Sequence, residues 1–129
     1  MSDHTSLHIV ANEDTFAYER LDAYRVAVEF LEVAEQLSKR LPRTKGQLGD
    51  QLARASEGVL LRIAEGAGAE YRSADQKRYF RSARGSALEC AAVLDVCRIK
   101  RIGTQEQLER GRALLLRIVQ MLTRLARAG

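Results

Sequence analysis

The segment QLARASEGVLLRIAEG, residues 51–66, has the pattern of a helix that is packed on more than one side. Its apolar residues recur at steps of three or four, the spacing of one helical face: Leu52, Ala55, Val59 and Ile63. Alanine, serine and glycine are frequent in the same segment, so a neighbouring helix can approach its backbone closely. We therefore expect a central helix from about residue 47 to Gly66, with this glycine as its C-cap.

The spacing of apolar residues predicts three more helices, over residues 21–41, 74–99 and 105–127. Pro42 ends the first of them, because proline disfavours helical geometry in the residue that precedes it. The loop that follows is short, so the next helix should return antiparallel. No segment alternates as a strand does. The sequence predicts an all-α, antiparallel up-down four-helix bundle over residues 18–129.

Two of the predicted helices begin with a capping box, a hydroxyl residue followed three positions later by glutamine. The first box is Ser73 with Gln76, and the second is Thr104 with Gln107. The last helix also has an apolar surplus beside its main row: Leu114, Leu116, Val119 and Met121. That surplus can pack on two neighbours within the bundle or on another subunit.

Residues 1–17 lack a sustained period and are predicted to form a mobile acidic leader. The leader has no basic start followed by a long apolar core, and no apolar run in the chain could span a membrane. We therefore expect a cytoplasmic protein with no membrane partner. His4 and His8 have the spacing of a helical metal pair, but no third ligand lies nearby in the sequence, so no metal site is expected.

The body of the chain has no histidine, so neither a serine–histidine nor a cysteine–histidine catalytic set can form there. The sequence therefore predicts no cofactor and no enzymatic activity. Cys90 and Cys97 lie seven residues apart, which places their Cα atoms about 10 Å apart on a helix and excludes a disulfide between them. We expect buried thiols that act as small apolar residues. Gly66 and Gly68 follow a helix and not a strand, which argues against a nucleotide-binding loop.

Two further features predict helix contacts. The pair Gly85–Ser86 lies inside the third predicted helix, where glycine costs about 1 kcal/mol relative to alanine. We expect a close helix crossing at that point. Glu65 and Glu89 are expected to be partly buried in a structural ion pair, with Arg54 or Arg62 as the partner.

Basic residues provide the main functional signal. One group lies on the last predicted helix, with three members at every seventh residue: Arg110, Arg117, Arg124 and Arg127. A second group begins the third predicted helix: Lys77, Arg78, Arg81 and Arg84. Further cations crowd the turn between these helices: Arg98, Lys100 and Arg101. Such rows can follow phosphates and release counterions. The alternative is a solvated face that acids such as Glu106 and Glu109 partly neutralise.

Three segments carry a family resemblance: LDAYRVAVEFLEVAEQL (21–37), QLARAS…IAEG (51–66) and ARGSALE (83–89). They are similar to the small bacterial four-helix-bundle family that includes proteins encoded in intervening sequences of large-subunit ribosomal RNA genes. The same family includes the accessory variability protein of diversity-generating retroelements. The motif positions are Gln51, Arg54, Ile63, Ala64, Glu65, Gly66, Gly85, Ser86 and Glu89.

Three positions depart from the family pattern. Leu60, Arg62 and Gly58 stand where the family usually has proline, asparagine and serine. If the usual residues serve a helix kink or a surface contact, this chain lacks it. Leu60 predicts an uninterrupted second helix.

The resemblance implies a bundle that assembles into a ring-shaped homopentamer, and it supplies no catalytic residues. It also implies that retroelement members bind a reverse transcriptase and nucleic acid through basic surface. Two hypotheses follow for this chain. It is a non-enzymatic oligomer that binds RNA or DNA through arginine-rich surface, as an accessory to a nucleic-acid-processing enzyme. Alternatively, it is a scaffold whose apolar surplus binds its own copies and one protein partner, with no nucleic-acid role.

Overall fold

The fold is described for residues 15–42 and 46–127 by a computed structural model. Its elements are one 3-10 helix and four α-helices: η1 (Ala17–Arg20), α1 (Asp22–Ser38), α2 (Leu48–Gly68), α3 (Ala74–Lys100) and α4 (Gln105–Arg127). The described residues contain no strand. The all-α prediction is confirmed, and each of the four helices begins and ends within three residues of its predicted position.

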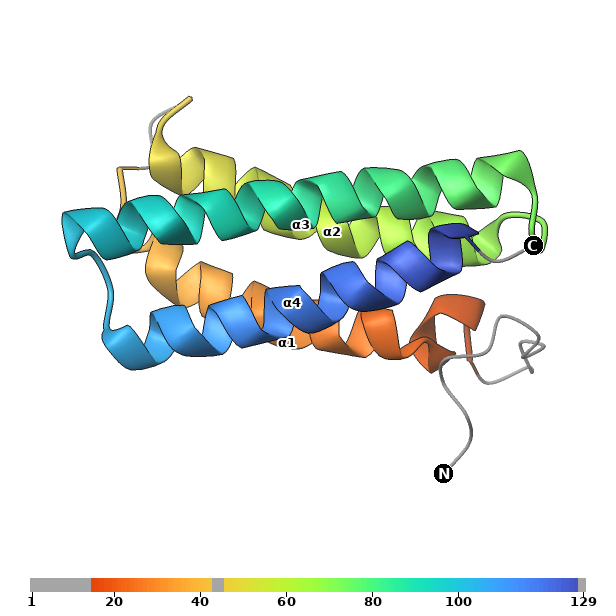
Figure 1. Cartoon of the computed structure of the whole chain (residues 1–129), viewed down its shortest axis with the longest axis horizontal. Helices are drawn as coiled ribbons and strands as arrows, with labels where there is room; N and C mark the ends of the chain where they lie inside the picture. Colours follow the sequence, from red (N-terminus) through yellow and green to blue (C-terminus); the bar gives the residue numbers. More distant parts are fainter. Residues whose placement is uncertain (1–14, 43–45, 128–129) are drawn as a thin grey trace.

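The four α-helices run antiparallel in chain order, and each packs on the two helices that flank it (Figure 1). In the view of Figure 1, α3 and α4 form the near face, with α2 and α1 behind them. The molecule therefore divides into an α1–α2 half and an α3–α4 half. The two halves meet where α2 packs on α3 and where α1 packs on α4.

Apolar side chains from every α-helix fill the space between the helices. The largest fully buried ones include Phe30, Leu52, Ile63, Phe80, Leu115 and Ile118. Cys90 and Cys97 are buried and free, as predicted. Burial raises the pKa of the Cys90 thiol to about 12 and also raises the pKa of Cys97. Both thiols are therefore protonated at neutral pH and act as small apolar residues.

The first helix, α1, ends at Ser38, three residues earlier than the sequence predicted. The backbone then tightens, and the Leu41 N–H donates to the carbonyl of Ser38, three residues back, at 3.2 Å. Pro42 prevents the helix from continuing through Leu41, because the residue before a proline avoids helical geometry. Leu41 nevertheless remains buried, so the apolar period continues for one turn beyond the helix.

Gly66 lies inside α2 and is not the predicted C-cap. The helix continues to Gly68, and its C-cap is Ala69 in an extended conformation. A Cβ atom at Gly66 would lie 2.7 Å from Cε1 of Phe80, whose ring is fully buried. Glycine is needed here because it lets α3 approach α2, and not because the backbone must turn.

Gln76 joins the start of α3 to the end of α2. Its N–H donates to Oγ of Ser73 at 3.1 Å, as the predicted capping box requires. Its side chain is buried, however, and Nε2 donates to the carbonyl of Gly66 at 2.9 Å. This box is therefore only half formed, because Oε1 of Gln76 accepts from the N–H of Arg72 at 2.8 Å and not from the N–H of Ser73. Thr104 and Gln107 form the complete box, with both hydrogen bonds at 3.1 Å.

The close crossing of α2 and α3 lies at Ser86. Gly85 faces open space, so its predicted part in the crossing is wrong. A Cβ atom at Gly58 would lie 3.2 Å from Oγ of Ser86 and 2.7 Å from Nη1 of Arg62. The Arg62 guanidinium therefore covers Gly58, and two positions that depart from the family pattern contact each other. Leu60 leaves α2 continuous, as predicted.

Candidate nucleic-acid interface

The start of α3 and the end of α4 lie at the same end of the bundle (Figure 1). Nη1 of Arg84 donates to Oγ1 of Thr123 at 3.4 Å, a bond between residues 39 positions apart in the chain. This antiparallel packing brings the second basic group beside the end of the first. We call the resulting surface the basic patch: Lys77, Arg78, Arg81, Arg84, Arg124 and Arg127.

Most of the basic patch is accessible and lacks an acidic partner. Lys77 and Arg84 are half-buried, and the other four members are exposed. Arg78 pairs with Asp75 at 3.2 Å, an exposed pair of small energetic value. Within the described ranges, no other member has a carboxylate oxygen within 4.0 Å. The patch is therefore a local excess of positive charge.

The arginines at every seventh residue of α4 have unequal surroundings. Arg110 pairs with Glu29 of α1 at 3.9 Å. A groove of about 300 Å³ at this point is also lined by Glu32 and Glu106. Arg117, midway between Arg110 and Arg124, is exposed. Arg110 is thus partly neutralised by α1, a compensation that the pattern within α4 did not suggest.

The two predicted acidic neighbours on α4 behave differently from the expectation. Glu109 accepts a hydrogen bond from Nε2 of Gln105 at 2.9 Å. Glu106 lines the groove beside Arg110 but is not within 4.0 Å of it. Neutralisation within α4 is therefore weak, and the acids that matter for Arg110 come from another helix.

Positive charge is concentrated in one half of the molecule. Residues 74–127, which form α3, α4 and their connection, have twelve Lys or Arg and five Asp or Glu, a net charge of +7. Residues 15–73 have nine of each, a net charge of zero. The two helices that have this excess, α3 and α4, pack on each other and lie together on one face of the bundle (Figure 1).

Four polar motif residues line a groove between α2 and α3, and Glu65 is not among them. The groove has a volume of about 370 Å³, and its lining includes Gln51, Arg54, Arg62, Ser86 and Glu89. Arg54 pairs with Asp50 at 3.7 Å, and not with Glu65 or Glu89. Both glutamates are exposed, so the predicted partly buried ion pair is wrong. The helices direct these carboxylates to solvent, where a pair contributes little.

The other motif positions have packing roles. Ile63 is fully buried, and Ala64 is half-buried beside it on α2. Gly66 has no Cβ atom and so leaves space for the ring of Phe80, as described above. The apolar and small motif residues Ile63 and Gly66 therefore explain how α2 packs in the bundle and against α3, whereas Glu65 and Gly85 face solvent.

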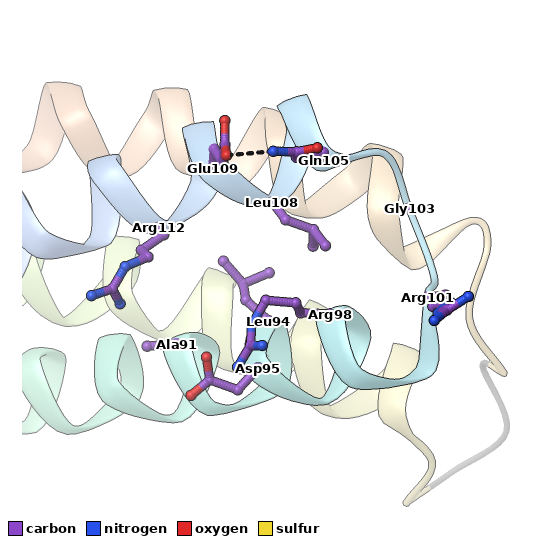
Figure 2. A pocket seen from close by; sticks show the side chains of 10 residues that line it. All are labelled: Ala91, Leu94, Asp95, Arg98, Arg101, Gly103, Gln105, Leu108, Glu109 and Arg112. Atoms are coloured by element: carbon purple, nitrogen blue, oxygen red, sulfur yellow. Dashed lines mark hydrogen bonds between the residues drawn. The ribbon is translucent and has the colours of Figure 1, made fainter.

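A further groove lies between α3 and α4, next to the turn that joins them (Figure 2). We call it the turn groove. Its volume is about 380 Å³, and it is lined by Ala91, Leu94, Asp95, Arg98, Arg101, Gly103, Gln105, Leu108, Glu109 and Arg112. Figure 2 shows Leu94 and Leu108 between the two helices and Arg112 extending from α4 toward α3.

Arg112 is the cation of the turn groove that the sequence patterns did not single out. The repeat of seven residues marks the side of α4 that faces α1 at Arg110. Arg112 lies on the side that faces α3, four residues after Leu108. The spacing of four residues from Leu108 could have identified Arg112 in the sequence, because residues four apart share a helix face. A long cationic side chain on that face can cover an apolar neighbour.

Metal-binding and membrane-spanning features were also predicted to be absent. Within residues 15–42 and 46–127, no three His, Cys, Asp or Glu side chains come together as a metal site requires. In the same part of the chain, no helix is both long enough and apolar enough to cross a membrane. His4 and His8 lie outside the described residues, as does most of the predicted leader.

Comparison with known protein families gives one match. Residues 19–124 match the family described as 23S rRNA-intervening sequence protein. The match extends from η1 into the last turn of α4, and so includes α2, α3 and the connections between the helices. A search of curated proteins finds no match.

Proposed function

The chain belongs to the 23S rRNA-intervening sequence protein family, and we propose that it is a non-enzymatic bundle protein that binds RNA or DNA through the α3–α4 face. The observation that carries this proposal is the excess of positive charge on α3, α4 and their connection, +7 for residues 74–127 against zero for residues 15–73. The family description names a ribosomal RNA, which is compatible with a nucleic-acid-related role.

The chemistry of the face favours contacts with the nucleic-acid backbone. Arginine and lysine bind phosphates and release counterions, which makes binding dependent on salt. The two aromatic residues of α3 and α4 offer little to bases, because Phe80 is fully buried and the half-buried ring of Tyr79 lies 5.0 Å from the Arg78 guanidinium. We therefore expect binding through the basic patch to depend weakly on sequence.

Charge reversal tests the proposal. The variant Arg124→Glu with Arg127→Glu removes two exposed cations at the end of α4, and the matched control Lys39→Glu with Arg40→Glu does the same just after α1. Both changes act at helix C-termini, so their effects on helix stability are comparable. Fluorescence anisotropy with labelled RNA and DNA at low salt should show roughly a tenfold loss or more for the first variant and little change for the control. Equal losses for both variants would contradict the assignment of the face.

We also propose that copies of the chain assemble, as the homopentamer that the family resemblance implies. Support comes from large apolar side chains on the outer surface, with Leu61, Leu88 and Leu116 each more than half exposed. Leu114 is buried, whereas Val119 and Met121 pack against the core, so much of the predicted surplus of α4 is used within the bundle. Light scattering coupled to size exclusion measures the assembly, and a monomer at all concentrations would refute it.

The alternative function is a protein scaffold without a nucleic-acid role. The same exposed leucines favour it, because isolated apolar side chains on a bundle can bind a helix of a partner. A reverse transcriptase as the partner stays a prediction from the resemblance. Capture of partners with and without nuclease separates the two functions: a protein retained after nuclease treatment favours the scaffold, and a protein lost favours the nucleic-acid proposal.

A further inference from the structure

The turn groove combines an apolar floor with charged walls from two helices. Leu94 is buried, and Ala91 and Leu108 are half-buried along the floor. Figure 2 shows Arg112 reaching from α4 toward α3, while Asp95 and Arg98 project from α3. The groove thus offers an apolar surface flanked by cations from both helices, with the carboxylates of Asp95 and Glu109 among them.

Glu109 is the second carboxylate that lines the turn groove. Its carboxylate accepts a hydrogen bond from Nε2 of Gln105, its neighbour on α4, at 2.9 Å. Asp95 is the exposed carboxylate that α3 contributes to the groove. A phosphate seated on the floor would be repelled by this carboxylate, whereas the amino groups of a nucleobase could donate hydrogen bonds to it.

We propose that the turn groove binds one unpaired base of a single-stranded nucleic acid. This proposal rests on the proposed function of the α3–α4 face. The ring lies on Leu94 and Leu108, Asp95 accepts a hydrogen bond from a base amino group, and Arg98 and Arg112 stack on the base or hold its phosphate. Guanidinium planes stack on bases in single-stranded recognition, and apolar surface tolerates any base.

The position of the groove connects it to the basic patch. Arg84 and Arg98 lie on α3 fourteen residues apart, which corresponds to about 21 Å along the helix axis. A strand that enters the groove can therefore continue along the same face to the patch. A duplex cannot use the groove in this way, because its bases are stacked and paired, and extruding one is costly. The turn groove thus gives the α3–α4 face a preference for single strands, whereas the basic patch contacts phosphates of either form.

The test compares three labelled DNA probes of equal length with the full chain: a single strand, its duplex, and the same strand with abasic positions. Fluorescence anisotropy at low salt should show the abasic strand binding about tenfold more weakly than the intact strand. The variant Ala91→Leu fills the groove without a change in charge, and Ala113→Leu is its control on the exposed side of α4. We expect only Ala91→Leu to lower the ratio of strand affinity to duplex affinity.

A second variant, Asp95→Ala, tests the same inference in case Ala91→Leu does not fold. Asp95→Ala removes an exposed acid, so simple electrostatics would strengthen the binding of every probe. We expect instead a lower ratio of strand to duplex affinity, because the acceptor for the base is lost. Equal binding of the intact and abasic strands, or an unchanged ratio in both variants, overturns the inference. In that case the Arg124→Glu and Arg127→Glu reversal still decides the proposed function by itself. Absence of binding to any probe overturns both.

Discussion

The α1–α2 half and the α3–α4 half are built by the same rules but present different surfaces. Both contribute fully buried side chains to one core, such as Phe30 and Leu52 from the first half and Phe80 and Ile118 from the second. Their charges differ, however, by seven units between residues 15–73 and 74–127. The core does not require this difference, and the proposed binding of nucleic acid rests on it.

The first prediction concerns the difference itself and has the largest expected effect. The substitutions Arg84→Gln and Arg124→Gln should reduce the slope of log K against log salt concentration by about two, where K is the binding constant for nucleic acid. The reduction is about one for each lost phosphate contact. The affinity lost between about 50 and 200 mM salt then becomes roughly tenfold smaller. Anisotropy titrations at several salt concentrations measure the slope. Lys39→Gln with Arg40→Gln is the control, and a similar change there would remove the contrast between the halves.

The second prediction concerns the packing that joins the halves. Gly66→Ala should lower the free energy of unfolding by about 1–3 kcal/mol, because a Cβ atom would overlap the buried Phe80 ring. Gly85→Ala, on the open side of α3, should raise it by about 0.5–1 kcal/mol through helix propensity. Urea denaturation measures both values. Effects of the same sign would show that the α2–α3 contact is looser than described.

The third prediction concerns the core of the charged half at alkaline pH. The pKa of Cys90 is raised to about 12 by burial, above its value of 9.0 in the unfolded chain. The protonated thiol is favoured in the folded state, so its stability contribution is complete below pH 9 and decreases from there to pH 12. The loss should be about 1.4 kcal/mol for each pH unit in this window.

Cys90→Ala provides the comparison for that loss. Its free energy of unfolding, measured with urea at several pH values, should decrease less steeply above pH 9 than that of the unmodified chain. Parallel pH dependence in the two proteins would show that Cys90 titrates normally in the fold.

The fourth prediction has the smallest effect and concerns Gly58 and Arg62. A serine at position 58 displaces the Arg62 guanidinium, which occupies the space of its Cβ atom. The effect of Gly58→Ser on the free energy of unfolding should therefore be more favourable in the presence of Arg62→Asn than alone. The coupling between the two substitutions should be at least about 0.5 kcal/mol. A double-mutant cycle by urea denaturation measures the coupling. Strict additivity would show that the two departures from the family pattern are independent.

Local sequence patterns predicted the helices because their causes are local. Apolar spacing, Pro42 and the Thr104–Gln107 box act within a few residues, and the observed bounds follow them closely. The glycines were interpreted less well. Gly66 looked like a helix end and Gly85 like a crossing, but which of them is crowded depends on the position of Phe80.

The candidate interface was predicted in part. The sequence identified Arg84, Arg124 and Arg127 but placed them in two separate groups, which only the packing of α3 on α4 brings together. It could not show that Glu29 compensates Arg110, because 81 positions separate these residues in the chain. Arg112 was missed, since it lies outside the seven-residue repeat.

The sequence by itself determined the number of helices, their approximate bounds, the buried thiols and the basic character of the last two helices. These properties depend on the spacing and composition of neighbouring residues, which are read along one dimension. The tertiary structure alone decided which charges share a face, which arginine meets an acid, and where a groove opens between Leu94 and Leu108. Those properties depend on distances between residues far apart in the chain, and packing sets them.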